Sequence, residues 1–190
     1  DAELHSGKGI SDMEKKIVSQ PYYSSQSTYP PRYYQRNAVN RTVEAIARGQ
    51  QRLLLVMATG TGKTYTAFQI VYRLLRSDLK KRILYLADRN ILVDQSILQD
   101  FAPLEKTTYK VDFSDKACLS KIASREVNFA LYHQMVGQND EEHFKQIPAE
   151  YFDLIIVDEC HRGSAKEDSN WRKVLEYFSS ATQILSLIHI

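Results

Sequence analysis

The chain contains the stretch Met57-Ala58-Thr59-Gly60-Thr61-Gly62-Lys63-Thr64, in which two glycines precede a lysine and a threonine. Residues 53–57 form a short apolar run typical of a buried strand, and residues 62–76 have the apolar spacing of a helix. Strand, glycine-rich turn and helix is the context in which a loop of this composition binds phosphate groups. The stretch therefore predicts an α/β fold with an anion site at one strand end.

The chemistry of this loop indicates ATP and Mg²⁺ as its ligands. Its glycines permit backbone angles closed to other residues, so that main-chain amides face the phosphate oxygens beside the positive end of the helix. Lysine adds a charge for the β- and γ-phosphates, and the last threonine offers a hydroxyl to magnesium. The predicted nucleotide-binding residues are Thr59, Gly60, Thr61, Gly62, Lys63 and Thr64. The alternative is that the stretch is a surface turn that resembles a phosphate loop by chance. This alternative stays open because Met57 occupies the position where the general phosphate-loop pattern has glycine.

A second strand end carries acidic residues. The apolar residues 154–157 are followed by Asp158 and Glu159, and ligands of open α/β folds bind at the carboxyl edge of the sheet. Asp158 is predicted to hold Mg²⁺, and Glu159 to orient the attacking water. A solvated acidic strand end is the alternative. We reject a Cys160–His161 nucleophile pair, because adjacent side chains point apart, and expect His161 to sense the nucleotide.

Apolar runs and helical patterns alternate along the rest of the chain. This order predicts a three-layer α/β domain with a mostly parallel sheet over residues 32–190, preceded by a polar lead-in arm or linker at residues 1–31. The section 103–150 is less clear apart from one strand. Further strands are expected at 83–87, 127–132, 152–157 and 183–187, and further helices at 33–49, about 91–98 and 171–178.

Composition sets broad limits on the protein. Its 190 residues are 43% apolar, enough for a core, and the net charge of +2 does not by itself indicate a nucleic-acid partner. Two cysteines without metal-type spacing favour a reducing compartment. No run approaches the ~18 apolar residues that cross a bilayer, so no membrane association is expected. The polar start without methionine indicates a piece of a longer protein.

Together these residues resemble the first RecA-like motor domain of superfamily 2 helicases and translocases. Asp158-Glu159-Cys160-His161 matches the DExH box of that group, whose loops tolerate a residue such as Met57. Arg32-Tyr33-Tyr34-Gln35 is similar to its Q-motif, which implies that Gln35 reads adenine while a neighbouring tyrosine or Arg32 packs on the base. A glutamine amide donates and accepts at once, which suits adenine. The alternative for Gln35 is a helix-start residue without a ligand.

The same resemblance implies contacts with DNA. Arg89 and Asn90, in Leu86-Ala87-Asp88-Arg89-Asn90, occupy the position of a motif that touches the nucleic-acid backbone. Gln134, in Tyr132-His133-Gln134-Met135, occupies the position of a further nucleic-acid segment. Ordinary loop residues are an equally good interpretation of both segments.

The residues after the acidic box narrow the resemblance. Asp158-Glu159-Cys160-His161-Arg162-Gly163-Ser164 and Glu167-Asp168-Ser169-Asn170-Trp171-Arg172 are similar to the motor of type I restriction enzyme R subunits. That likeness implies a bacterial or archaeal cytoplasmic protein that translocates duplex DNA with ATP, alongside methyltransferase and specificity subunits. The alternatives are another superfamily 2 repair or RNA helicase, a kinase or nucleotide switch, and a binding module without catalysis.

Parts of that family's machinery are not evident in the sequence. We expect an upstream nuclease domain and a second RecA-like domain to belong to the same natural chain. We also expect residues 185–190, Leu-Ser-Leu-Ile-His-Ile, to be non-native, because one frame of a common transposon adapter encodes them. An arginine finger from a second domain is worth ~10³–10⁵ in turnover, so this chain alone should hydrolyse ATP weakly or not at all.

Overall fold

The computed structural model describes residues 12–25, 30–58, 60–87, 99–137, 141–158 and 165–187. These residues form a six-stranded sheet of order β1-β6-β5-β2-β4-β3. All of its neighbouring strands are parallel. The strands are β1 (Arg52–Val56), β2 (Ile83–Ala87), β3 (Thr108–Lys110), β4 (Val127–Leu131), β5 (Leu154–Val157) and β6 (Thr182–Leu187).

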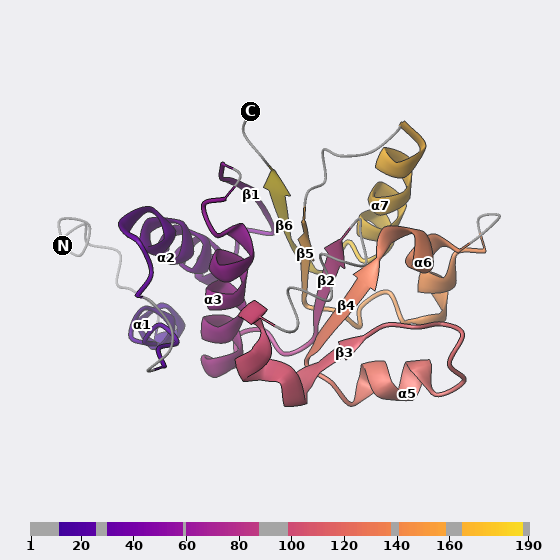
Figure 1. The fold of residues 1–190 in the computed structure, drawn as a ribbon, viewed down its shortest axis with the longest axis horizontal. Coiled ribbons are helices and arrows are strands. Elements are labelled where there is room, and N and C mark those ends of the chain that lie inside the picture. Colours follow the sequence, from indigo (N-terminus) through magenta and orange to yellow (C-terminus); the bar gives the residue numbers. More distant parts are fainter. Residues whose placement is uncertain are drawn as a thin grey trace.

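Helices cover the sheet on both faces (Figure 1). One layer contains α1 (Asp12–Val18), α2 (Tyr33–Ala47) and α3 (Lys63–Arg76). The other contains α5 (Cys118–Ala123), α6 (Tyr132–Val136) and α7 (Ala165–Tyr177). Short 3₁₀ turns at Ala102–Thr107 and His143–Gln146 lie between these elements in the sequence. The three-layer α/β fold predicted from the sequence is confirmed.

Side-chain alternation along the strands divides the core into two parts. In β2, Tyr85 packs into the core beneath α2 and α3, whereas Leu84 and Leu86 pack into the core beneath α6 and α7. In β5, Ile156 belongs to the first core and Val157 to the second. Because both faces are buried, these strands are apolar without interruption, which is why the sequence marks them clearly.

Strand β1 is the exception, because one of its faces is uncovered. Leu55 is buried, while Leu54 is 59% exposed and Val56 is 46% exposed. β1 lies at the edge of the sheet and pairs with β6 through Leu54 opposite Leu185. The described part of the chain therefore presents an apolar strip on an edge strand.

Several elements differ from the sequence predictions. The arm expected at residues 1–31 contains α1, whose Ile17 is buried in the first core and accepts a hydrogen bond from Arg73 through its carbonyl. The domain boundary at residue 31 stays a prediction. β3 and α5 were not predicted, and Tyr132, expected to end a strand, begins α6. The helix expected at 91–98 lies outside the described residues.

The helices of the described residues include none that is long and apolar enough to cross a bilayer.

Candidate nucleotide-binding site

The loop between β1 and α3 is held open by two glycines with left-handed backbones. Gly60 has φ +75° and Gly62 has φ +79°, angles that other residues rarely adopt. The Thr61 hydroxyl donates to the carbonyl of Ala58 at 2.6 Å, which closes the turn on itself. Gly62 precedes α3 and has no side chain to cap it, so the first amides of the helix remain suited to an anion.

Two further residues of the loop motif begin α3. Lys63 is the first residue of the helix, and its Nζ atom is shielded from solvent. Thr64 follows it and is half-buried. Thr59 lies outside the described residues. The structure thus places Gly60, Thr61 and Gly62 in the turn, and Lys63 and Thr64 at the start of the helix that follows it.

Gln35 supports this turn from α2. Its Oε1 accepts the main-chain N–H of Arg32 at 2.8 Å, and its Nε2 donates to the carbonyl of Thr61 at 2.9 Å. A Cβ atom at Gly62 would lie 2.5 Å from that Nε2 atom, so the amide fits only against glycine. Each half of the amide has one hydrogen-bonding position left, and the reading of adenine by Gln35 stays a prediction.

Aromatic and basic side chains lie beside Gln35 at the start of α2. The Arg32 guanidinium donates to the Tyr34 hydroxyl at 3.2 Å. Tyr33 is 79% exposed and meets Tyr34 edge to face, with 5.5 Å between ring centroids. An exposed ring of this kind presents a flat apolar surface, and the packing of a tyrosine or Arg32 on a base stays a prediction.

Asp158 follows β5 and is 7% exposed. Its Oδ2 accepts the Tyr85 hydroxyl at 2.9 Å, and its carbonyl accepts the Tyr132 hydroxyl at 2.5 Å. Its N–H donates to the carbonyl of Leu86 at 2.8 Å. Burial raises the pKa of the Tyr85 hydroxyl well above its ordinary value, and the Asp158 carboxylate raises it further, so Tyr85 stays protonated and donates.

The loop and Asp158 lie at the same edge of the sheet. Only β6 separates β1 from β5, which places their parallel carboxyl ends about 10 Å apart at the upper edge in Figure 1. Side-chain alternation puts Asp158 on the face of Leu154 and Ile156, the face that α3 covers. The structure therefore directs the carboxylate toward the layer in which the loop lies.

The donor set at this edge suits Mg²⁺. Thr64 supplies a hydroxyl and Asp158 a carboxylate, both of them hard oxygen ligands. Among the described residues no group of three or more His, Cys, Asp or Glu side chains could enclose a metal by itself. A magnesium ion here would take its remaining ligands from phosphate oxygens and water, as Mg²⁺ usually does.

The other predicted site residues, apart from Gln134, fall outside the part of the chain that the structure describes. Glu159, His161, Arg89 and Asn90 lie outside the described residues. Gln134 lies in α6 directly after β4, and its Oε1 atom is shielded from solvent without a hydrogen-bond partner in the described part of the chain. The DNA contacts expected of Arg89, Asn90 and Gln134, and the roles expected of Glu159 and His161, stay predictions.

The two tyrosines that contact Asp158, Tyr85 and Tyr132, were not predicted from the sequence. A tyrosine within an otherwise aliphatic buried strand needs a partner for its hydroxyl, and Tyr85 in Ile83-Leu84-Tyr85-Leu86-Ala87 is such a residue. That signal was present in the sequence, although it does not name the partner.

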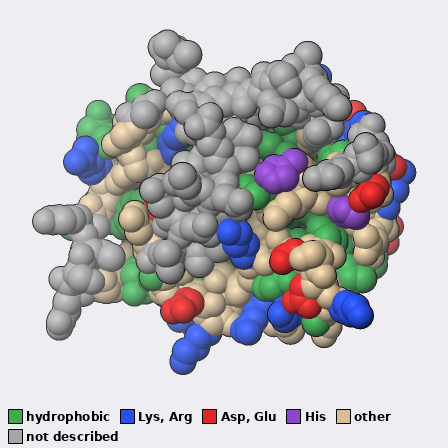
Figure 2. Space-filling view, turned by 45° about the vertical axis from the view of Figure 1, so that its right-hand side comes forward, with side chains coloured by type: hydrophobic (Ala, Val, Ile, Leu, Met, Phe, Trp, Pro, Cys, Tyr) green, Lys and Arg blue, Asp and Glu red, His purple; other side chains and the backbone are tan. Residues whose placement is uncertain are grey.

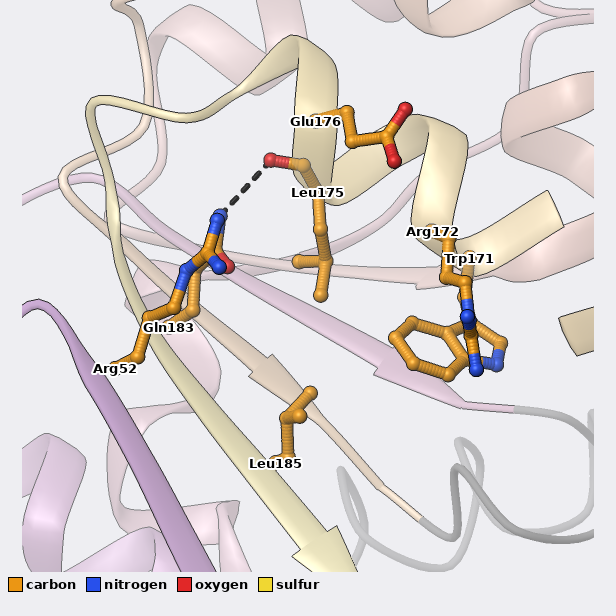
Figure 3. Close-up of a pocket in the computed structure, with 7 residues that line it drawn as sticks. All are labelled: Arg52, Trp171, Arg172, Leu175, Glu176, Gln183 and Leu185. Atoms are coloured by element: carbon orange, nitrogen blue, oxygen red, sulfur yellow. Dashed lines mark hydrogen bonds between the residues drawn. The ribbon is translucent and has the colours of Figure 1, made fainter. Parts of the chain in front are cut away.

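A separate cavity of about 240 Å³ lies between strands β1 and β6 and helix α7 (Figure 3). The Gln183 amide donates to the Leu175 carbonyl at 2.8 Å in its wall. Its lining residues are Arg52, Trp171, Arg172, Leu175, Glu176, Gln183 and Leu185. None of them belongs to the phosphate loop, so this cavity is distinct from the loop.

One face of the described surface shows charges of both signs. On the face drawn in Figure 2, the described lysine and arginine side chains are interspersed with acidic and apolar ones. This pattern agrees with the net charge of +2.

Comparison with known proteins identifies the family. A family model described as "Type III restriction enzyme, res subunit" matches residues 28–186. The chain belongs to this family. It is 51% identical over 184 residues to the type I restriction enzyme EcoAI endonuclease subunit of Escherichia coli, covering 93% of this chain and 21% of that protein.

Solved structures agree with membership of this res subunit family. A structure described as a fragment of an HsdR subunit of a type I restriction enzyme from Vibrio vulnificus YJ016 is 35% identical, with a TM-score of 0.71 over 96% of this chain and 30% of that one. The UvsW helicase of bacteriophage T4 is 18% identical with a TM-score of 0.65, over 99% of this chain and 63% of that one, and shows the fold alone. The predicted superfamily 2 motor domain, related to type I R subunits, is confirmed.

Proposed function

We propose that this domain is the ATP- and Mg²⁺-binding half of a DNA translocase motor in the R subunit of a type I restriction enzyme. The chain spans 21% of the EcoAI subunit. The domains and subunits that would complete the motor are therefore also proposed. They comprise a second RecA-like domain, an upstream nuclease domain, and partner methyltransferase and specificity subunits. Joined to that second domain, the motor hydrolyses ATP and moves along duplex DNA.

The observation that carries this proposal is the shared sheet edge of the loop and Asp158. Main-chain amides at Gly60 and Gly62 and the Lys63 ammonium bind the phosphates, with Thr64 and Asp158 as ligands of the metal. Bound magnesium neutralises charge that develops on the phosphoryl oxygens. Glu159 orients the attacking water. These groups position the reactants and stabilise charge, which is most of what phosphoryl transfer requires.

Another superfamily 2 motor, such as a repair helicase, would use the same nucleotide residues. The identity of 51% to a type I restriction subunit over 184 residues favours the restriction motor.

Nucleotide binding is tested with a fluorescent ATP analogue, with and without Mg²⁺. Lys63→Ala removes a charged contact with phosphate worth about 1.5–3 kcal/mol, so the affinity should fall about 10- to 100-fold. Lys116→Ala, at an exposed lysine between β3 and α5, is the matched control and should bind as the wild type does. Equal affinities for wild type and Lys63→Ala would refute nucleotide binding by the loop.

The DNA part of the proposal is tested separately, by titrating duplex DNA at several salt concentrations. Phosphate contacts release counterions, so the affinity should fall steeply as salt rises. A salt-independent affinity would contradict a basic track for DNA. Strong DNA-stimulated ATP hydrolysis by this chain alone would contradict the need for an arginine finger from a second domain.

A further inference from the structure

Asp158 forms hydrogen bonds with residues of β2 and with Tyr132, which directly follows β4. β2 provides the Tyr85 hydroxyl for its carboxylate and the Leu86 carbonyl for its N–H. The hydroxyl of Tyr132, the first residue of α6, donates to its carbonyl. Main chain and side chain of Asp158 are therefore fixed by separate contacts, and Tyr85 is the tyrosine that reaches the carboxylate.

The Tyr85 ring is itself fixed in the core. It is 1% exposed, and its centroid lies 5.7 Å from that of Phe101 and 5.0 Å from that of Phe129. Packing of this kind leaves a ring few alternative rotamers, so its hydroxyl has one position. A phenylalanine would fill the same space. The hydroxyl therefore adds little to packing and directs one hydrogen bond at Asp158.

We propose that Tyr85 is a positioning residue that holds the Asp158 carboxylate in the orientation needed for the magnesium that accompanies the nucleotide. An ionised carboxylate has about four lone-pair sites, and Tyr85 uses one of them. The bond restricts rotation of the carboxylate and occupies one of these sites. This inference rests on the proposed nucleotide function of the site.

The test is the Mg²⁺ dependence of nucleotide binding by Tyr85→Phe. The substitution keeps the ring and removes the hydroxyl. Loss of a group that orients a metal ligand typically weakens metal binding 10- to 100-fold, so the Mg²⁺ concentration for half-maximal binding should rise about tenfold.

Tyr151→Phe is the matched control. It also removes a tyrosine hydroxyl that donates a hydrogen bond, here to the carbonyl of Ile122 at 3.1 Å. Tyr151 precedes β5 and so lies toward the opposite edge of the sheet from Asp158. Its loss should change thermal stability at most and leave the Mg²⁺ dependence as in the wild type.

A double-mutant cycle separates positioning from a structural role. If Tyr85 acts through the carboxylate, Tyr85→Phe should have no further effect on Mg²⁺ dependence in an Asp158→Asn background. Additive effects, or a folded Tyr85→Phe within about twofold of the wild type, would overturn the inference alone. If the wild type itself shows no Mg²⁺-dependent nucleotide binding, the proposed function falls and the inference falls with it.

Discussion

Replacing Gly62 by alanine should perturb the phosphate loop through backbone strain and through a steric clash with Gln35. Its backbone has φ +79°, where a Cβ atom costs about 1–2 kcal/mol. The new Cβ would also lie 2.5 Å from Gln35 Nε2, so the amide must move. Moving it breaks two hydrogen bonds, each worth about 0.5–1.5 kcal/mol. Gly62→Ala should therefore lower the free energy of unfolding by about 2–5 kcal/mol.

Two glycines provide matched controls for the backbone contribution. Gly49 has φ +83° after α2, and Gly60 has φ +75° within the same loop. A Cβ atom added at either meets no atom within 4 Å. Gly49→Ala and Gly60→Ala should therefore cost only the left-handed backbone penalty, about 1–2 kcal/mol. Urea unfolding followed by circular dichroism gives all three values.

A variant that combines Gln35→Ala with Gly62→Ala tests whether Gln35 is the residue with which the new Cβ atom clashes. Gln35→Ala removes the amide, so adding Gly62→Ala to it should cost only about as much as Gly60→Ala. Equal destabilisation by Gly62→Ala, Gly49→Ala and Gly60→Ala would refute the claim that Gln35 supports the loop. So would full additivity of Gln35→Ala and Gly62→Ala.

Three other regions give independent expectations. Asp153 accepts two main-chain N–H groups just before β2, so Asp153→Ala should lower the free energy of unfolding by about 1–3 kcal/mol in urea titrations, and an unchanged midpoint would contradict this. The exposed apolar strip on β1 is expected to promote self-association, so Leu54→Lys should lower the sedimentation coefficient at high protein concentration, whereas Leu119→Lys, on α5, should not. A hydrogen bond from Lys121 holds the pKa of Asp115 below its usual range, so this carboxylate adds stability above about pH 4 that is lost on acidification. Asp115→Asn should accordingly flatten the fall in stability below pH 4 in unfolding curves, and identical pH profiles would exclude that contribution.

The predictable parts of the fold are those whose burial produces a recognisable pattern of apolar residues within one short segment. β2 and β5 are buried on both faces, so each is an unbroken apolar run. α1 is different, because its seven residues are mostly polar and its place depends on Ile17 entering a core built by later segments. β3 has three residues, too few for alternation to be recognised.

The candidate site likewise has residues that a local motif predicts and contacts that only the folded structure shows. The loop residues follow one another in sequence and have fixed chemical roles, so a motif suffices to find them. Tyr85 and Asp158 are 73 residues apart, and their contact depends on Tyr85 lying opposite Ile156 in the sheet. The register of β2 against β5 cannot be derived from the spacing of these residues in the sequence. The same is true of Gln35, whose contact with Thr61 becomes visible only when α2 packs beside the loop.

Strand register is therefore part of the site's chemistry as well as of its stability. Successive side chains of a strand face opposite sides of the sheet, so a shift of β5 by one residue would turn Asp158 from the α3 face to the α7 face. The observed register, with Leu86 opposite Val157, is held by Ile156 in one core and Val157 in the other. It is also held beyond the strand by the Asp158 N–H on the Leu86 carbonyl. The apolar residues of β5 thus determine which face receives the carboxylate, and Tyr85 then determines how that carboxylate is oriented.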